Sequence, residues 1–386
     1  MILLKRPPND EFTLRLFFNF SSKIKEEHDS IYLWSLILDP NWNQVEDHVY
    51  LNKVYSFQRD FKTLLDTSPQ KELILLGIKD HLTAGEFNPW DEDCPNLIRS
   101  VIDLITKHDD KKFILLTSLE NLDSYITLPN VKTIVPWGGD ITNQSFQYKK
   151  LNLNIEKNFD SKYSYLSLNR NKRPNRLFLL DLLFALGIEN TGLISCIFKD
   201  DIRYHFNHYN WRFNDTQLES FFEKGEKKLY QYNFPITDSV NIYKNLDNDN
   251  VENLKKTLFR YYQNTFVELI CETSYTEKCF LITEKTQNSI FGKNFPIWIS
   301  SKGTVQFLRD MGIDVFDDII DHSYDLIEDP ITRIYTAVTS NMKLLTNLNL
   351  IKSLWKNNVH RFDQNIKFIQ NDMYRFYHDR TMNYEF

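Results

Sequence analysis

The sequence predicts an α/β fold with two Rossmann-like, doubly wound domains in series, followed by C-terminal helices. Short apolar runs alternate with helical patterns through the first 160 residues, and the same alternation restarts near residue 160. The chain has 386 residues, and a single hydrophobic core stops growing at roughly 250–300 residues. We expect domains at 1–158 and 159–350, and a helical segment at 351–386 that packs back on them.

The first domain contains four short apolar runs that we expect to be strands, at 12–20, 71–78, 111–119 and 131–140. Segment 95–108 between two of them has the apolar spacing of a helix, and Pro95 suits its first turn. Strands that alternate with helices in this way predict a parallel sheet covered on both faces.

The second domain repeats this pattern. We expect strands at 162–170, 192–196 and 266–273, an apolar helix at 175–188 and a short helix at 303–313. Gly187 and Gly312 lie where these two helices should end. From Pro330 the pattern is helical almost to the end of the chain.

Bulk composition excludes several classes of protein. A net charge of -6 argues against a surface that is basic throughout, and the four cysteines form no C-x-x-C pair for zinc or redox chemistry. No signal peptide opens the sequence and no apolar stretch reaches the length of a membrane span. Frequent Asn, Lys, Ile and Phe indicate an AT-rich bacterial or viral genome. We expect a cytoplasmic protein, in the host cytoplasm if the source is viral.

The segment from Ser145 to Arg176 is the one basic stretch, with eight Lys or Arg and only two acidic residues. Its last ten residues, SLNRNKRPNR, leave a predicted strand and enter an apolar helix whose first N–H groups are open to anions. The sequence has no Gly-rich phosphate loop, so a phosphate site would be built from side chains such as Arg170 and Arg176. The alternative is a basic, solvated helix start.

A second charged segment lies between two apolar runs, FLITEKTQNSIFGKNFPIWIS at 280–300. Thr283 is the expected N-cap of a helix whose first turn holds Glu284 and Lys285. Glu284 suits the helix dipole without any ligand, whereas a lysine there is unfavourable. An anionic ligand would resolve that conflict, with Lys285 on a phosphate and Glu284 accepting from ribose hydroxyls.

Together these segments resemble the C-terminal donor half of fucosyltransferase-like glycosyltransferases of the GT-B type, including phage and marine-microbe proteins. The resemblance covers roughly residues 160–350. It rests on the strand-to-helix segment 169–176, the F-x-x-x-E-K pattern that ends at Lys285, Pro296, and the run LRDMGIDVFDDIIDHSYD at 308–325.

The resemblance implies two domains that face a cleft. Either Arg170 or Arg176 would hold the diphosphate together with Lys285, Glu284 would hold the ribose, and Asn169 and Thr283 would lie in the same nucleotide-sugar site. Tyr324 could also face this cleft, and a surface loop is the alternative. Periplasmic binding proteins and several dehydrogenases share this two-domain plan, and all of them bind ligands at the carboxyl ends of strands.

An inverting transfer needs a carboxylate or His within about 3 Å of the acceptor hydroxyl. The resemblance implies that this catalytic base comes from the first domain. We favour Glu86 and then Asp80, with Asp140 as a further candidate. Two acidic triplets, Asp91–Asp93 and Asp247–Asp249, imitate a metal-binding D-x-D motif, but neither follows a clear apolar strand. We therefore expect no metal.

The expected function is transfer of a sugar from a UDP- or GDP-sugar to an acceptor hydroxyl, with inversion and without a metal or a covalently bound cofactor. The nucleotide sugar is a co-substrate, and the acceptor is a glycan or a hydroxymethylated DNA base. The alternative is a non-catalytic, two-domain protein that binds anions or nucleotides.

Overall fold

The computed structural model describes the following residues: 31–36, 62–63, 66, 73–78, 105–117, 128–134, 155–169, 174–196, 224–225, 227–229, 231–232, 234, 258–272, 275 and 282–382. The chain divides into two compact units. One unit comprises 1–143, 276–281 and 373–386, and the other comprises 144–275 and 282–372. The expected strand at 12–20 and the first ten residues of the expected helix at 95–108 lie outside the described residues.

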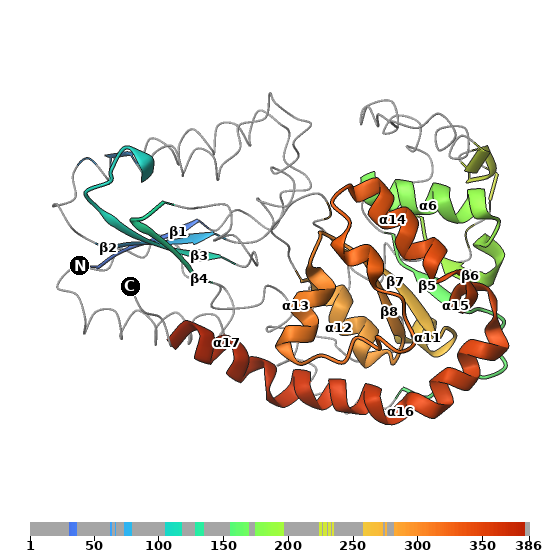
Figure 1. Ribbon diagram of the computed structural model, residues 1–386. Coiled ribbons are helices and arrows are strands. Elements are labelled where there is room, and N and C mark those ends of the chain that lie inside the picture. The colour runs from blue at the N-terminus through green and yellow to red at the C-terminus, as the bar shows by residue number, and fades with distance from the viewer. Residues whose placement is uncertain are drawn as a thin grey trace. The chain divides into compact units, whose positions relative to one another are not determined.

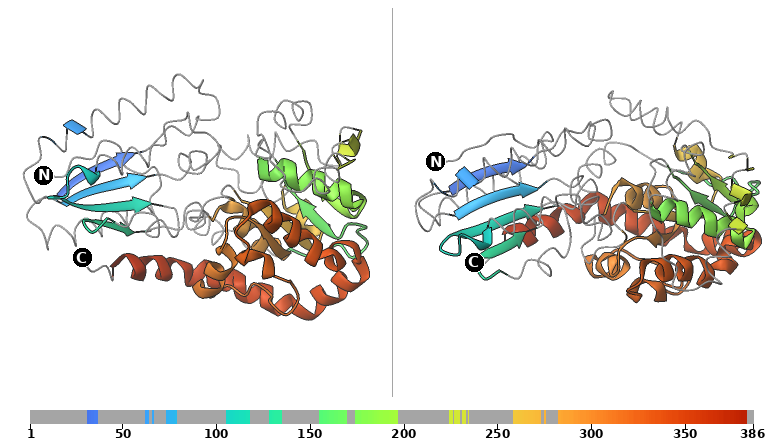
Figure 2. Two further views of the ribbon diagram at one scale, coloured as in Figure 1. Left: turned by 45° about the horizontal axis from the view of Figure 1, so that its top comes forward. Right: turned by 90° about the horizontal axis from the view of Figure 1, so that it is seen from above.

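The first unit contains a four-stranded sheet of parallel strands in chain order. The strands are β1 (Ile31–Leu36), β2 (Leu73–Ile78), β3 (Lys112–Thr117) and β4 (Val131–Ile134). Ile31 pairs with Leu73, and Leu73 pairs in turn with Lys112. Figure 2 shows the four strands side by side and pointing the same way. Three of the strands match expected ones, whereas β1 was missed although it is an apolar run.

The second unit contains another parallel sheet, in the order β6-β5-β7-β8. Its strands are β5 (Tyr165–Ser167), β6 (Gly192–Ile194), β7 (Val267–Cys271) and β8 (Phe295–Ile299). Every residue in these four strands is buried, as expected for a parallel sheet covered on both faces. An α/β fold with parallel sheets is therefore confirmed.

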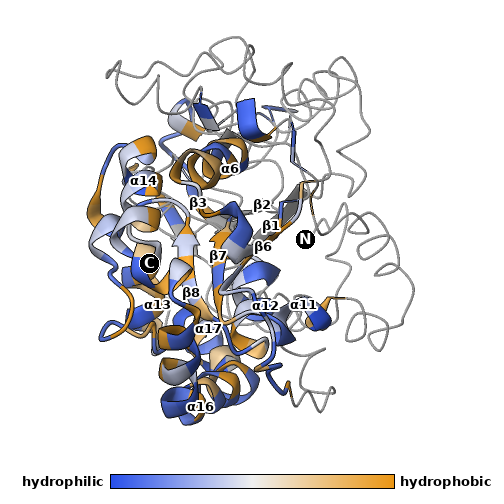
Figure 3. Ribbon diagram, turned by 90° about the vertical axis from the view of Figure 1, so that its right-hand side faces the viewer, coloured by the Kyte–Doolittle hydropathy of each residue, from blue (hydrophilic) through white to orange (hydrophobic). Residues whose placement is uncertain are grey.

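Helices cover both faces of this second sheet. Helices α6 (Pro174–Leu186) and α14 (Pro330–Ser340) contact each other on one face. Helix α12 (Glu284–Phe291) packs on β7 and β8 and contacts α16 (Leu348–Asn371) on the other (Figure 1). Apolar residues run along α6, while α16 alternates polar and apolar residues (Figure 3), in keeping with a buried helix and a surface helix respectively.

The remaining elements are short or terminal. They are α11 (Phe259–Gln263), α13 (Thr304–Met311), α15 (Met342–Thr346), α17 (Met373–Met382) and the 3-10 helices η3 (Glu189–Thr191) and η6 (Ser323–Leu326). Helix α13 lies between Gly303 and Gly312, which adopt φ angles of 84° and 106° that favour glycine. Among the described helices, none is both long and apolar enough to cross a membrane.

Lys157 joins three parts of the second unit at one buried point. Its Nζ donates to the backbone oxygens of Tyr262, Thr265 and Gly292 at 2.7, 2.7 and 2.8 Å, and also to Asn294 Oδ1. Burial lowers the pKa of Lys157 well below its ordinary value. The oxygens around Lys157 Nζ nevertheless need N–H donors, and the ammonium form of the lysine supplies three.

We expect Lys157→Met to lower the free energy of unfolding by at least about 3 kcal/mol, because buried carbonyl groups would lose charged donors. Urea unfolding followed by tryptophan fluorescence measures this. Lys162→Met, at an exposed position five residues away, should change stability by less than about 0.5 kcal/mol. Equal unfolding midpoints for the two variants would contradict the role of Lys157.

Candidate functional site

The strand order of the second sheet creates a natural binding position between β5 and β7. The chain leaves β5 toward β6 on one side and then crosses to β7 on the other, so the connections diverge from this pair of strands. Ligands of open α/β sheets bind at such switch points, beyond the carboxyl ends of the strands. Helices α6 and α12 both begin after strands of this sheet.

Five of the residues expected at a ligand lie at this edge of the second sheet or in the helix starts that follow its strands. Asn169 is buried two residues beyond β5, and Arg176 is buried in the first turn of α6. Thr283 is the N-cap of α12, as predicted, and Glu284 and Lys285 open that helix. The candidates Arg170, Asp80, Glu86 and Asp140 lie outside the described residues.

The centre of this arrangement is a residue that sequence reasoning missed, Glu272, which follows β7 directly. Its side chain is 1% exposed. Oε1 accepts from the Thr283 backbone N–H at 3.2 Å and from the Thr286 hydroxyl at 2.8 Å, and Oε2 accepts from the Thr283 hydroxyl. A buried carboxylate is stable only when donors surround it, and the start of α12 provides them.

Lys285 is held against the same carboxylate. Its Nζ lies 3.8 Å from Glu272 Oε2 and 3.4 Å from Glu284 Oε1, and it donates to Thr283 Oγ at 2.9 Å. Two carboxylates thus compensate for a lysine placed at a helix N-terminus, where a cation is otherwise unfavourable. An anionic ligand is therefore not required to explain Lys285, although it could exchange with these carboxylates.

Arg176 belongs to the same electrostatic cluster although α6 carries it. Burial raises the pKa of Glu284, but the charge of Lys285, hydrogen bonds and the charge of Arg176 outweigh it and lower the pKa below its ordinary value. Burial also raises the pKa of the Cys271 thiol to about 12, against the opposing charges of Arg176 and Lys285. Two cations from separate helices therefore act on the same end of β7.

Two buried asparagines join the strand ends at this edge. Asn169 Nδ2 donates to the backbone oxygen of Ser195 beyond β6 at 3.2 Å, and Asn175 Nδ2 donates to that of Glu272 at 3.0 Å. Because carbonyl oxygens only accept, these bonds determine which way each amide faces. Within the described part of the chain, both Oδ1 atoms are buried without a hydrogen-bond partner.

The sequence did hold a signal for Glu272. The run FVELICE at 266–272 is apolar except for Glu268 and Glu272, and a fully buried strand seldom tolerates an acid without a reason. Burial raises the pKa of Glu268 to about 8, against a hydrogen bond at 2.9 Å from the Tyr262 hydroxyl. Glu268 is therefore mostly a neutral acid at pH 7, whereas Glu272 is surrounded by donors and Lys285.

Tyr324 lies elsewhere in the unit, where its hydroxyl covers the edge strand β8. The hydroxyl accepts from the Trp298 backbone N–H at 3.0 Å and lies 3.2 Å from His322 Nδ1. His322 Nε2 lies 2.8 Å from the oxygen of Val315, so it must donate and Nδ1 must accept from Tyr324. Both hydrogen-bonding directions of the hydroxyl are thus used internally, which favours a structural role over ligand contact.

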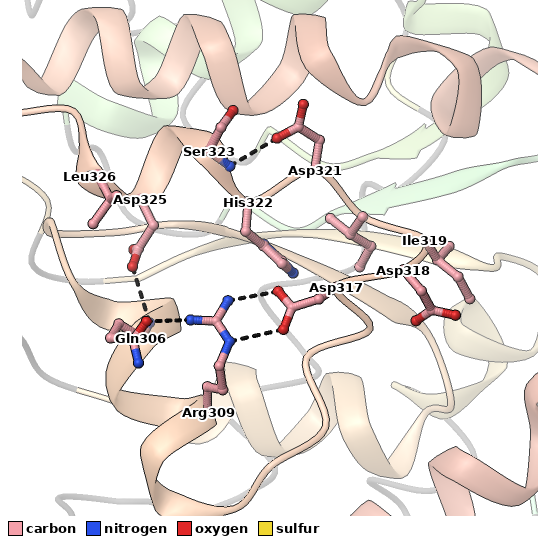
Figure 4. Close-up of a pocket in the computed structure, with 11 residues that line it drawn as sticks. Gln306, Arg309, Asp317, Asp318, Ile319, Asp321, His322, Ser323, Asp325 and Leu326 are labelled. Carbon is pink, nitrogen blue, oxygen red and sulfur yellow. Dashed lines mark hydrogen bonds and ion pairs between the residues drawn. The ribbon is translucent and has the colours of Figure 1, made fainter.

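A pocket of about 510 Å³ adjoins this segment (Figure 4). Four aspartates line it, at positions 317, 318, 321 and 325, together with Arg309 and His322. Arg309 makes a two-bond pair with Asp317 at 2.6 and 2.8 Å, and Asp325 accepts from the backbone N–H groups of Val305 and Gln306 at the start of α13. These contacts explain much of the lining as helix capping and ion pairing.

The neutral state of His322 predicts a pH-dependent stability. Burial lowers the pKa of His322, although the Val315 oxygen and the nearby Asp317 and Asp325 oppose this and Arg309 reinforces it. The unfolded chain therefore takes up this proton first, starting near its ordinary pKa of about 6.5. Stability from this group is complete above about pH 6.5 and falls below it, by at most about 1.4 kcal/mol per pH unit.

Denaturant unfolding between pH 5 and pH 8 measures this, with His322→Gln as the variant that cannot titrate. We expect the free energy of unfolding of this variant to fall less steeply below pH 6.5 than that of the unchanged protein. His360→Gln, at an exposed position on α16, should show the same decline as the unchanged protein. Parallel pH profiles for all three proteins would remove His322 as the source.

Comparison with known proteins adds no identification to this geometry. No model of a known protein family matches the chain, and no curated protein matches it. The side chains at the carboxyl ends of β5 and β7 are the features of the second unit that indicate a ligand.

Proposed function

We propose that the protein is a glycosyltransferase that takes a sugar from a nucleotide-diphosphate sugar and transfers it to an acceptor hydroxyl. The second unit would bind the UDP- or GDP-sugar at the carboxyl ends of β5 and β7. The reaction would proceed with inversion and without a metal. The wider arrangement of two Rossmann-like domains around a cleft belongs to the same proposal.

One observation carries this proposal: Arg176 and Lys285, which open different helices, both act on Cys271 at the end of β7 and on Glu284 at the start of α12, beside the switch point of the sheet. The N-terminus of a helix presents unpaired N–H groups and a partial positive charge, both of which favour phosphate. Cationic side chains at two such ends suit a diphosphate, whose charge is spread over two groups.

Lys285 would exchange a carboxylate partner for the diphosphate when the nucleotide sugar binds. Glu272 and Glu284 hold Lys285 in the structure. A bound diphosphate would draw Lys285 away from Glu284 and free that carboxylate to accept from ribose hydroxyls. Arg176 and Lys285 would then stabilise the charge that develops on the departing diphosphate.

The acceptor would lose its proton to a base from the first unit, with Glu86 and then Asp80 as our candidates. The acceptor itself would be a glycan or a hydroxymethylated DNA base. These two classes differ in their response to salt, because binding to DNA releases counterions and weakens steeply as salt rises. Turnover that is insensitive to salt would favour the glycan.

A screen of UDP- and GDP-sugars tests the proposal directly. Mass spectrometry should detect release of the free nucleotide diphosphate for one donor, faster in the presence of the acceptor. Thermal stabilisation by nucleotides without hydrolysis of any donor would instead identify the non-catalytic nucleotide-binding alternative. A chain that neither binds nor hydrolyses any of these donors would contradict both.

Removal of the Lys285 ammonium group tests the site itself. We expect Lys285→Ala to weaken binding of the matching nucleotide diphosphate at least tenfold, or about 1.4 kcal/mol, because a direct charge–phosphate contact is lost. Isothermal titration calorimetry measures the affinity.

Lys302→Ala is the matched control, because Lys302 is an exposed lysine in the same unit that pairs with Glu328. We expect it to bind the nucleotide as tightly as the unchanged protein does. Equal affinities for Lys285→Ala and the unchanged protein would remove Lys285 from the site.

A further inference from the structure

Glu272 contacts the starts of both helices that carry the proposed cations. Its side chain accepts three hydrogen bonds from the first turn of α12, two from Thr283 and one from Thr286. Its backbone oxygen accepts from Asn175 in the first turn of α6. One residue therefore links the α6 residue next to Arg176 and the α12 residues on either side of Lys285.

The Thr283 hydroxyl connects Glu272 to the Lys285 ammonium group. Lys285 Nζ donates to Thr283 Oγ at 2.9 Å, and this hydroxyl in turn donates its own hydrogen to Glu272 Oε2. The hydroxyl can accept from Lys285 in this way because its hydrogen is directed at the carboxylate. The position of Nζ thus depends on a negatively charged acceptor at residue 272.

A carboxamide could not replace this carboxylate. If the glutamine Nε2 faced Thr283 Oγ, it would compete with Lys285 as a donor to that oxygen. If it faced the other way, it would meet the Thr283 backbone N–H and leave two donors opposed. Either orientation breaks a hydrogen bond that the carboxylate makes, with little change in size.

We infer that Glu272 is a positioning residue of the anion site, which sets the spacing of Arg176 and Lys285 and directs Lys285 through the Thr283 hydroxyl. This inference rests on the proposed function, because it assumes that the two cations meet the diphosphate of a nucleotide sugar. Glu272 itself would not contact the ligand.

The competing explanation is that Glu272 has a purely structural role. The chain contains another carboxylate that can serve as a control for such a role. Asp325 is a second buried carboxylate that accepts backbone N–H groups at a helix start, from Val305 and Gln306 of α13. No proposed ligand residue opens α13. Asp325→Asn should therefore destabilise the fold as a lost cap does, without a change in anion affinity.

The test is a set of affinities measured by calorimetry on the full chain, with inorganic pyrophosphate, UDP and GDP as probes. The variants are Glu272→Gln, Thr283→Val, Lys285→Ala, Asp325→Asn and the double variant Glu272→Gln with Lys285→Ala. Thr283→Val breaks the same hydroxyl link and carries the test if Glu272→Gln does not fold. Circular dichroism and thermal melting establish which variants are folded.

We expect Glu272→Gln and Thr283→Val each to weaken binding at least fivefold, while Asp325→Asn leaves it unchanged. Because Glu272 acts on the ligand largely through Lys285, its substitution should cause little further loss in the Lys285→Ala background. Losses that multiply in the double variant would instead indicate general damage and overturn the positioning role.

The remaining outcomes separate this inference from the proposed function. If Lys285→Ala weakens binding but Glu272→Gln binds as well as the unchanged protein or more tightly, Glu272 is only a competing counter-ion and the inference alone fails. If the unchanged protein binds neither pyrophosphate nor either nucleotide, the proposed function fails and the inference fails with it.

Discussion

The second unit depends on a carboxylate buried where β7 ends. Taking the charge of Glu272 out of water would cost several kcal/mol without donors around it. The donors come from Thr283 and Thr286, which can reach it only when α12 starts at one particular place. The same residue holds Asn175 by its backbone oxygen, so the start of α6 is tied to the same strand end. Glu272 thereby fixes the end of β7 against the starts of α12 and α6.

Charge compensation at this edge is local, and this shapes how the site could work. Arg176 and Lys285 are balanced by Glu272 and Glu284, so an anion bound at this edge would have to compete with these carboxylates. Such competition favours a ligand with several negative charges and hydroxyl donors over a simple monoanion. Lys157 offers a contrast, because fixed backbone oxygens hold its ammonium group and leave nothing to exchange.

The run at 308–325, which contributed to the resemblance to glycosyltransferases, has a structural purpose of its own. It supplies the end of α13 and the Arg309–Asp317 pair. It also supplies the Tyr324 hydroxyl, which accepts a hydrogen bond from the backbone N–H of Trp298 on the edge strand β8. Unpaired edges of sheets invite association with other chains, and covering them is a common solution. Tyr324 and His322 achieve this through one chain of hydrogen bonds.

The sequence by itself determined strands β5, β6 and β7 and helices α6, α12 and α13, because apolar runs, Gly187 and Gly312, and the Thr283 cap are local signals that act over a few residues. It also indicated that 169–176 and 280–300 carry unusual charges. Only the tertiary structure decided that β5 and β7 are neighbours, that Glu272 lies under the start of α12 and that Tyr324 points at β8. Those contacts join residues far apart in the chain, and their energies depend on burial and distance, which a linear pattern does not contain.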